Sequence, residues 1–169
     1  MKNIFIILSI CAIHVCISQA QEMGKGMSLF NAGAGFVPGW GINACYEYGL
    51  VDTWGSGVFT IGAYVGYGYR GEKIKSAWSD GDPKYHVNTL AFGPRATYRY
   101  AFTDSFEVYW AIMFGAIVHT YSKHYDSESG SFFEIAAGCR YTLFGSSFSV
   151  FAETGYHVSY LKCGLCYSF

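Results

Sequence analysis

Apolar and polar side chains alternate with a period of two along most of the chain after residue 27. In residues 160–169 the apolar side chains of the odd positions face away from Lys162, Gly164 and Ser168 on the even positions. A β-strand points successive side chains to opposite faces, so this pattern predicts a strand with two unlike faces. The same alternation predicts seven earlier strands, at residues 28–36, 40–50, 57–70, 85–101, 105–118, 132–143 and 147–156.

The connections between these strands are of two lengths. Residues 71–84 and 119–131 are polar and interrupt the alternation, so we expect them to be loops. The other connections are short, and several contain Gly, Pro or Asp. The two long loops follow the third and fifth strands, which places both at the same end of an up-and-down barrel.

A final strand with one wholly apolar face has to be paired if it is not to leave an exposed edge. In a bilayer only a closed barrel pairs every strand, so the last strand is expected to pair with the first. The sequence therefore predicts an all-β fold, an eight-stranded antiparallel up-and-down transmembrane β-barrel preceded by a signal peptide. Phe92, Trp110 and Leu165 are expected to face hydrocarbon rather than the centre of the molecule.

The first twenty residues read as a secretory signal peptide. Lys2 precedes an apolar run over residues 4–17, and Ser18, Gln19 and Ala20 form a small-x-small cleavage site. The apolar run is shorter than the roughly 20 residues of a spanning helix, and a lipoprotein signal at Cys16 is an alternative. We expect cleavage after Ala20, residues 21–169 as the barrel domain, and a location in the bacterial outer membrane.

Composition favours the same class of protein. Aromatic residues make up 20% of the chain and charged residues only 14%, whereas soluble domains have about 25% charged residues. A net charge of −1 gives no indication of nucleic-acid binding. A soluble lipocalin-like barrel also alternates, but with its polar face outward, and the polar face here is mostly small residues with too few charges for a solvated exterior.

The polar face carries a nearly balanced set of charges. Small residues and paired charges suit a narrow interior, and eight strands leave room for little more than side chains. Hairpin geometry predicts that Arg99 lies directly opposite Glu107 and that Arg140 lies diagonal to Glu153. We expect these charges to pack and neutralise the lumen, with a pore or gate as the alternative. The expected interior network comprises Glu47, Arg70, Arg95, Arg99, Glu107, Glu134, Arg140, Glu153 and Lys162.

With its signal peptide, eight alternating strands, charged interior and terminal Phe169, the mature chain resembles the small outer-membrane barrels of the OmpA/OmpX type. The resemblance implies insertion by the barrel assembly machinery, with Tyr167 and Phe169 as the C-terminal assembly signal. It also implies contact with the lipid bilayer and lipopolysaccharide. No cofactor is implied.

Candidate chemistry in the sequence is weak. His157 and Ser159 match the His-x-Ser spacing of the barrel enzyme lipid A deacylase, but no acidic residue follows to orient the histidine. The His119 and Glu128 segment matches no recognised metal-site spacing. The four cysteines outside the signal peptide are expected as unpaired thiols that fill space, although disulfides remain open.

Three functions are compatible with these features. The first is a non-catalytic structural or surface-interaction barrel that contacts an extracellular partner through residues 71–84 and 119–131, with Trp78, Tyr121 and Tyr125 as candidate recognition residues. The first alternative is OmpW-like passive passage of small or apolar solutes. The second alternative is a lipid A-modifying enzyme that uses His157 and Ser159.

Overall fold

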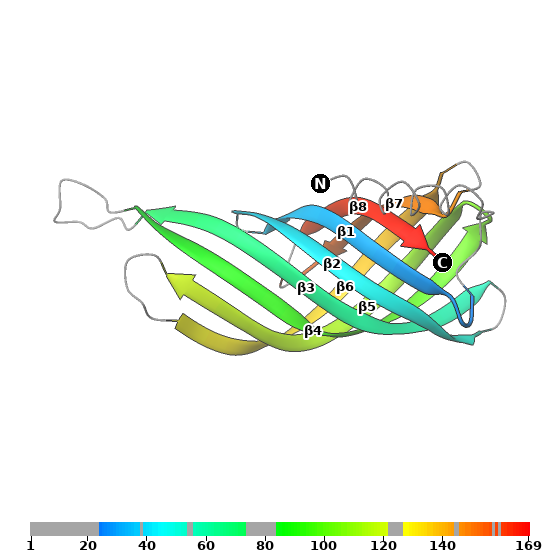
Figure 1. Cartoon of the computed structure of the whole chain (residues 1–169), viewed down its shortest axis with the longest axis horizontal. Coiled ribbons are helices and arrows are strands. Elements are labelled where there is room, and N and C mark those ends of the chain that lie inside the picture. Colours follow the sequence, from blue (N-terminus) through cyan, green and yellow to red (C-terminus); the bar gives the residue numbers. More distant parts are fainter. Residues whose placement is uncertain are drawn as a thin grey trace, which may run out of the picture.

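A computed structural model describes residues 24–37, 39–53, 56–73, 84–121, 127–143, 146–156, 158 and 160–169. They form a closed barrel in which every strand is antiparallel to both neighbours (Figure 1). The eight predicted strands and their up-and-down order are confirmed. The strands are β1 (Ser28–Val37), β2 (Gly39–Asp52), β3 (Gly57–Lys73), β4 (Lys84–Thr103), β5 (Phe106–Tyr121), β6 (Ser127–Thr142), β7 (Phe148–Gly155) and β8 (Leu161–Ser168).

The first and last strands close the barrel. β1 and β8 pair from Leu29 opposite Ser168 to Phe36 opposite Leu161. Ser28 and Phe169 exchange two backbone hydrogen bonds of 2.8 and 2.9 Å just beyond this ladder. Closure gives hydrogen-bond partners to the backbone groups that would lie unpaired at the edges of an open sheet. In hydrocarbon each unpaired backbone group costs several kcal/mol.

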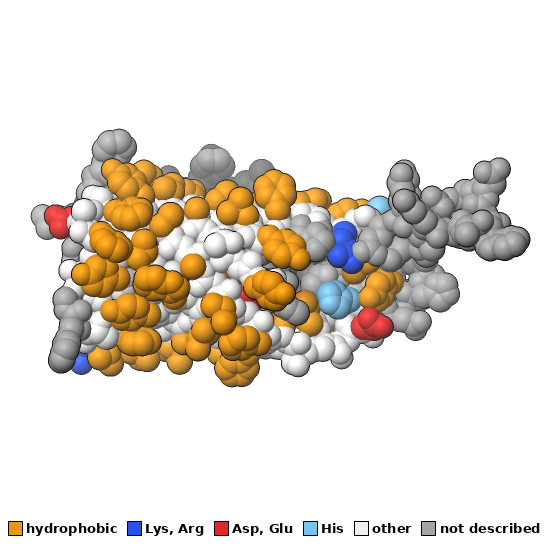
Figure 2. Space-filling view, turned by 180° about the vertical axis from the view of Figure 1, so that it is seen from behind, with side chains coloured by type: hydrophobic (Ala, Val, Ile, Leu, Met, Phe, Trp, Pro, Cys, Tyr) orange, Lys and Arg blue, Asp and Glu red, His pale blue; other side chains and the backbone are white. Residues whose placement is uncertain are grey.

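The outer surface of the barrel is apolar and the inner surface is polar. Phe92, Trp110 and Leu165 are exposed, at 47%, 54% and 57%, which confirms their predicted outward orientation. Figure 2 shows hydrophobic side chains over most of the visible wall, with charged and histidine side chains mainly toward the two ends. In water so large an apolar surface would drive association, whereas in a bilayer it meets lipid. No helix among the described residues is long and apolar enough to cross a membrane.

Aromatic side chains cluster at both ends of the apolar surface. At the inner end, where Ser28 and Phe169 lie, Phe148 and Tyr167 pack with ring centroids 5.1 Å apart. At the opposite, outer end, the Tyr69 ring lies 5.9 Å from Trp40 and 5.2 Å from His86. Amphipathic rings favour the headgroup layer, so the two clusters mark the two membrane interfaces.

The two segments expected as loops are shorter than the sequence suggested. β3 continues to Lys73 and β4 begins at Lys84, while β5 continues to Tyr121 and β6 begins at Ser127. The ladder persists through polar pairs such as Gly71 opposite His86 and His119 opposite Glu128. Strand pairing requires only backbone groups, so it can continue where the side chains become polar. The change to polar side chains marks the point where these strands leave the hydrocarbon interior of the membrane. Consequently β3 to β6 extend further at the outer end than the other four strands (Figure 1).

Candidate functional site

Eight of the nine charged residues expected inside the barrel are buried in its lumen. Each is no more than 6% exposed, and the set contains four carboxylates and four cations, so its formal charge is zero. They lie on strands β2 and β4 to β8, at the alternate positions whose side chains point into the lumen. These residues are Glu47, Arg95, Arg99, Glu107, Glu134, Arg140, Glu153 and Lys162.

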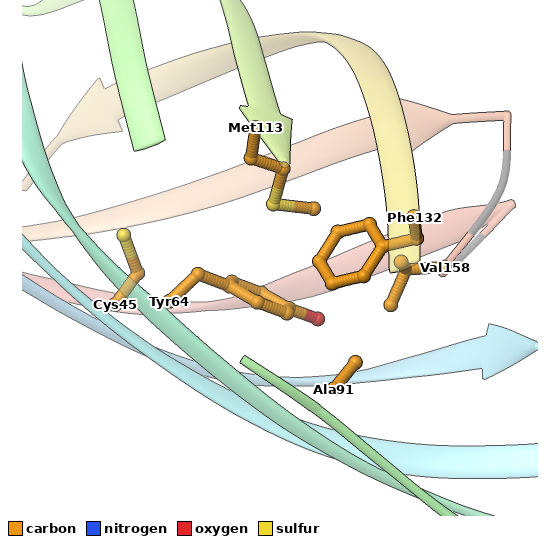
Figure 3. Close-up of a cluster of buried hydrophobic side chains, with 6 residues drawn as sticks. All are labelled: Cys45, Tyr64, Ala91, Met113, Phe132 and Val158. Atoms are coloured by element: carbon orange, nitrogen blue, oxygen red, sulfur yellow. The ribbon is translucent and has the colours of Figure 1, made fainter. Parts of the chain in front are cut away.

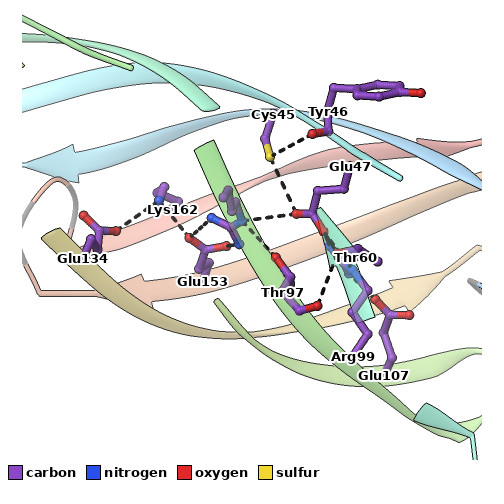
Figure 4. Close-up of polar contacts among 11 residues, drawn as sticks. Cys45, Tyr46, Glu47, Thr60, Thr97, Arg99, Glu107, Glu134, Glu153 and Lys162 are labelled. Atoms are coloured by element: carbon purple, nitrogen blue, oxygen red, sulfur yellow. Dashed lines mark hydrogen bonds and ion pairs between the residues drawn. The ribbon is translucent and has the colours of Figure 1, made fainter. Parts of the chain in front are cut away.

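Ion pairs join these residues into one chain of alternating sign, and Figure 4 shows the part of it from Glu134 to Glu107. An unpaired charge in a dry interior costs several kcal/mol, so a continuous chain lets the lumen hold eight charges without exposing them to water. In order, the chain runs Glu134, Lys162, Glu153, Arg95, Glu47, Arg99, Glu107 and Arg140.

Two arginines on β4 form the centre of the chain. Arg95 reaches Glu153 at 2.6 Å and Glu47 at 3.2 Å. Arg99 reaches the other oxygen of Glu47 at 2.8 Å and also contacts Glu107. Two guanidinium groups therefore share one carboxylate, and each also binds a second one. Planar guanidinium forks suit such bridging because their donors point in fixed directions.

Neutral side chains complete the network, and the sequence argument did not single them out. Thr60 donates a 2.7 Å hydrogen bond to Glu47, and the Arg95 Nε donates to the Thr97 hydroxyl at 3.3 Å. The Arg99 guanidinium lies 4.6 Å from the centre of the Tyr109 ring. Thr60, Thr97 and Tyr109 could have been found from the sequence, because their positions in the alternation point inward. A buried charge needs hydrogen-bond partners besides opposite charges, so polar residues at such positions are expected to join the network.

Of the two predicted pairings, the direct opposition of Arg99 and Glu107 is wrong, and the diagonal placement of Arg140 and Glu153 is confirmed. The ladder places Arg99 opposite Tyr109 and Ala101 opposite Glu107, because the turn lies at residues 104–105 rather than being centred on Thr103. A register irregularity also lies between Ala101 and Thr103. Arg99 still reaches Glu107, but diagonally. Arg140 is diagonal to Glu153 as expected, since Gly138 is the residue opposite Glu153. However, its ion pair is with Glu107, its direct neighbour on β5, at 2.7 Å.

An apolar layer covers the outer side of this network (Figure 3). The Tyr64 ring from β3 and the Phe132 ring from β6 approach each other across the lumen, with Met113 beside them. The Lys162 ammonium lies 4.7 Å from the Tyr64 ring centre, so the charged and apolar layers are in direct contact. Glu134 accepts a hydrogen bond from the backbone N–H of Val158, and this bond holds Val158 in the apolar layer.

Beyond the apolar layer, the outer half of the lumen contains a cavity of about 330 Å³. Arg70, the ninth charged residue, lines this cavity at a half-buried position. Tyr121 was expected on a loop, but it lies in β5, lines the same cavity and donates a 3.1 Å hydrogen bond to Glu128. Trp78, Tyr125, His157 and Ser159 lie outside the described residues.

The terminal aromatic residues and the cysteines take defined positions. Tyr167 stacks on Phe169 at the inner rim with ring centroids 5.7 Å apart. All four described cysteines are free thiols: Cys45 and Cys166 point into the lumen, Cys139 is half-buried, and Cys163 is exposed on the lipid side.

Comparisons with known proteins give a match only at the level of structure. No family model matches the sequence, and no curated protein matches it. The N-terminal β-barrel domain of Pseudomonas aeruginosa OprF is similar with a TM-score of 0.59 at 14% identity, covering 86% of this chain and 99% of that one. The Yersinia pestis attachment invasion locus protein Ail, in complex with the heparin analogue sucrose octasulfate, gives 0.50 at 14% identity with the same coverage.

A second Ail structure, the backbone structure in a phospholipid bilayer nanodisc, gives a TM-score of 0.50 at 16% identity and covers 86% of this chain and all of that one. At these identities the likeness concerns the fold. Together with the apolar outer wall and the charged lumen, it identifies the chain as a transmembrane β-barrel with the fold of the small bacterial outer-membrane barrels.

Proposed function

We propose that this protein is a closed, non-catalytic barrel of the bacterial outer membrane that presents an interaction surface on the outer ends of β3 to β6. The observation that carries the proposal is the filled lumen. The chain of ion pairs and the Tyr64 and Phe132 layer lie in series across it, which supports a lumen closed to solutes. The surface beyond the membrane is then the part of the barrel that a macromolecular partner can reach.

The outward extension of four strands supports such a surface. β3 pairs with β4 as far as Lys73 and Lys84, whereas β1 and β2 meet at Val37 and Gly39. A paired extension carries the strand ends beyond the bilayer on a rigid support, and recognition commonly uses surfaces on such a support. Ail, an attachment protein by its name and crystallised with a heparin analogue, offers a precedent for binding at a barrel of this fold.

Solute passage, the first alternative, requires the filled lumen to open. Conductance across planar bilayers tests this directly, and we expect no channel events from the wild-type protein. Regular unitary conductance steps would contradict the closed barrel. The lipid A-modifying alternative depends on His157 and Ser159, so Ser159→Ala compared with wild type on lipopolysaccharide, followed by mass spectrometry, tests that reaction.

The surface role is tested by exchange of the outer connections. Residues 74–83 and 122–126 are replaced by short glycine–serine segments, and residues 104–105 at the inner end are replaced as the matched control. Binding of cells displaying each variant to immobilised heparin and to host-cell surfaces is then measured. We expect loss of binding only in the outer variants. Equal binding by all folded variants, or none by the wild type, would contradict the surface role. Assembly by the barrel assembly machinery and contact with lipopolysaccharide belong to the same proposal.

A further inference from the structure

The cavity in the outer half of the lumen lies inside the barrel, whereas the surface role uses the outside of the strand extensions. Its volume of about 330 Å³ lies at the lower end of the roughly 300–1,000 Å³ found for ligand cavities. We propose that it is a binding site for a small uncharged molecule that is apolar at one end and carries a hydrogen-bonding group at the other. This site would exist whether or not the outer loops bind a partner.

Glycines form part of one wall of the cavity. Gly35, Gly41 and Gly68 line it and are neighbours across three strands, because Gly35 lies opposite Gly41 and Gly41 lies opposite Gly68. Elsewhere the narrow lumen of an eight-stranded barrel is filled by side chains. This wall instead leaves room for a flat or extended molecule against bare backbone.

Apart from Asn43, the side chains that line the inner part of the cavity are mostly apolar. Val87 and Ala91 from β4 and Ile117 from β5 line its sides, and Tyr64 and Val158 form its floor. Val87, Ala91 and Tyr64 are buried, at 4%, 1% and 5% exposed. Transfer of an apolar group from water into such a site is favourable by about 25 cal/mol per Å² buried.

The outer part of the cavity offers hydrogen-bonding groups of both kinds. The Thr89 hydroxyl and the Nδ1 atom of His119 are 2.9 Å apart, which fixes the imidazole and leaves Nε2 as its second donor or acceptor. Arg70 and Glu128 carry opposite charges around the same opening. A hydroxyl or carbonyl group is therefore better matched than a net charge, because either sign would meet a like charge.

The cavity is closed at its inner end and is not part of a passage across the barrel. Its floor is the Tyr64 layer, and the Lys162 ammonium lies directly beneath the Tyr64 ring at 4.7 Å. A bound molecule must therefore leave by the end at which it entered. This separates the proposal from solute passage, since binding is expected without conductance.

Titration of the protein in lipid nanodiscs with 1-naphthol, followed by NMR of labelled Ala, Ile and Val methyl groups, tests the site. The probe is uncharged at neutral pH and has an apolar ring system with one hydroxyl. We expect saturable shifts at the inward methyl groups of Val87, Ala91 and Ile117. The lipid-facing Ile61, Ile112 and Ile135 report probe dissolved in the bilayer and should change without saturation.

Three variants and one analogue sharpen this test. Val87→Phe fills the cavity and should weaken binding at least about tenfold, whereas Val65→Phe on the lipid face should leave it unchanged. Naphthalene, which lacks the hydroxyl, should bind about three- to tenfold more weakly than 1-naphthol to the wild type, and His119→Phe should abolish the difference. Equal, non-saturable shifts at inward and outward methyl groups would overturn the proposal, as would unchanged binding by folded Val87→Phe.

Discussion

Arg95 and Glu153 face each other across the lumen and form two parallel hydrogen bonds, with Nη1–Oε1 of 3.1 Å and Nη2–Oε2 of 2.6 Å. Arg95 lies on β4 and Glu153 on β7, and these strands are not neighbours in the barrel. The fork geometry fixes both the distance and the orientation of the partners. The pair therefore ties two separate parts of the wall together through the interior.

Removal of one partner of this pair should be costly. Arg95→Met leaves Glu153 with only Lys162 and Glu47 with only Arg99 as ion-pair partners among the described residues. Breaking a buried pair typically costs about 3–5 kcal/mol, so we expect a loss of that size in the free energy of unfolding. Urea unfolding in lipid bilayers measures it, with Phe92→Met on the lipid face of the same strand as control. A loss below about 1 kcal/mol would show that the network contributes little.

The cost of placing a charge on the lipid-facing surface is expected to depend on its depth in the membrane. Ile112 is exposed near the middle of β5, opposite Ala96 and Ile135. Ile112→Arg should lower the free energy of unfolding by about 2–4 kcal/mol, because the charge must enter hydrocarbon. Phe102→Arg at the inner rim should cost only about 0–1 kcal/mol. Equal costs at the two positions, measured by the same unfolding experiment, would place the membrane elsewhere on the barrel.

The cysteines predict a labelling pattern. A charged, membrane-impermeant maleimide should label none of the four described thiols in folded protein. Cys45 and Cys166 are enclosed in the lumen. Cys139, next to the inward-pointing Arg140, and Cys163 lie on the lipid side. After denaturation without reductant, Cys45, Cys139, Cys163 and Cys166 should all react, as judged by intact mass. Fewer than four adducts before reduction, rising to four after it, would reveal a disulfide.

Substitution of Phe169 is expected to affect assembly in cells more than the stability of the folded barrel. Phe169 is 59% exposed and stacks on Tyr167, so Phe169→Ala removes little buried surface. Refolding into lipid vesicles without other proteins should change by no more than about 1 kcal/mol. In cells, the folded barrel should decrease several-fold if Phe169 is read by the assembly machinery. Phe106→Ala at the same rim is the matched control, and an equal decrease in both variants would argue against a specific signal.

The interior face of each strand could be assigned from the sequence. Glu47, Arg95 and Lys162 alternate with apolar neighbours, and a strand fixes the side of each residue by its parity alone. Strand ends could not be assigned in the same way. Residues 127–131 lack apolar alternation because they leave the membrane, yet their backbone remains paired with β5.

The partners of the charged residues followed from closure of the barrel. Arg95 and Glu153 are 58 positions apart, and no local rule relates them. Their contact depends on the tilt and stagger of all eight strands, to which the irregularity near Thr103 contributes. The outer cavity has the same origin: its glycine wall and its apolar side come from five strands and are brought together by their register. Alternation along the chain is a local property and can be read residue by residue, whereas contacts across a lumen depend on the geometry of the complete barrel.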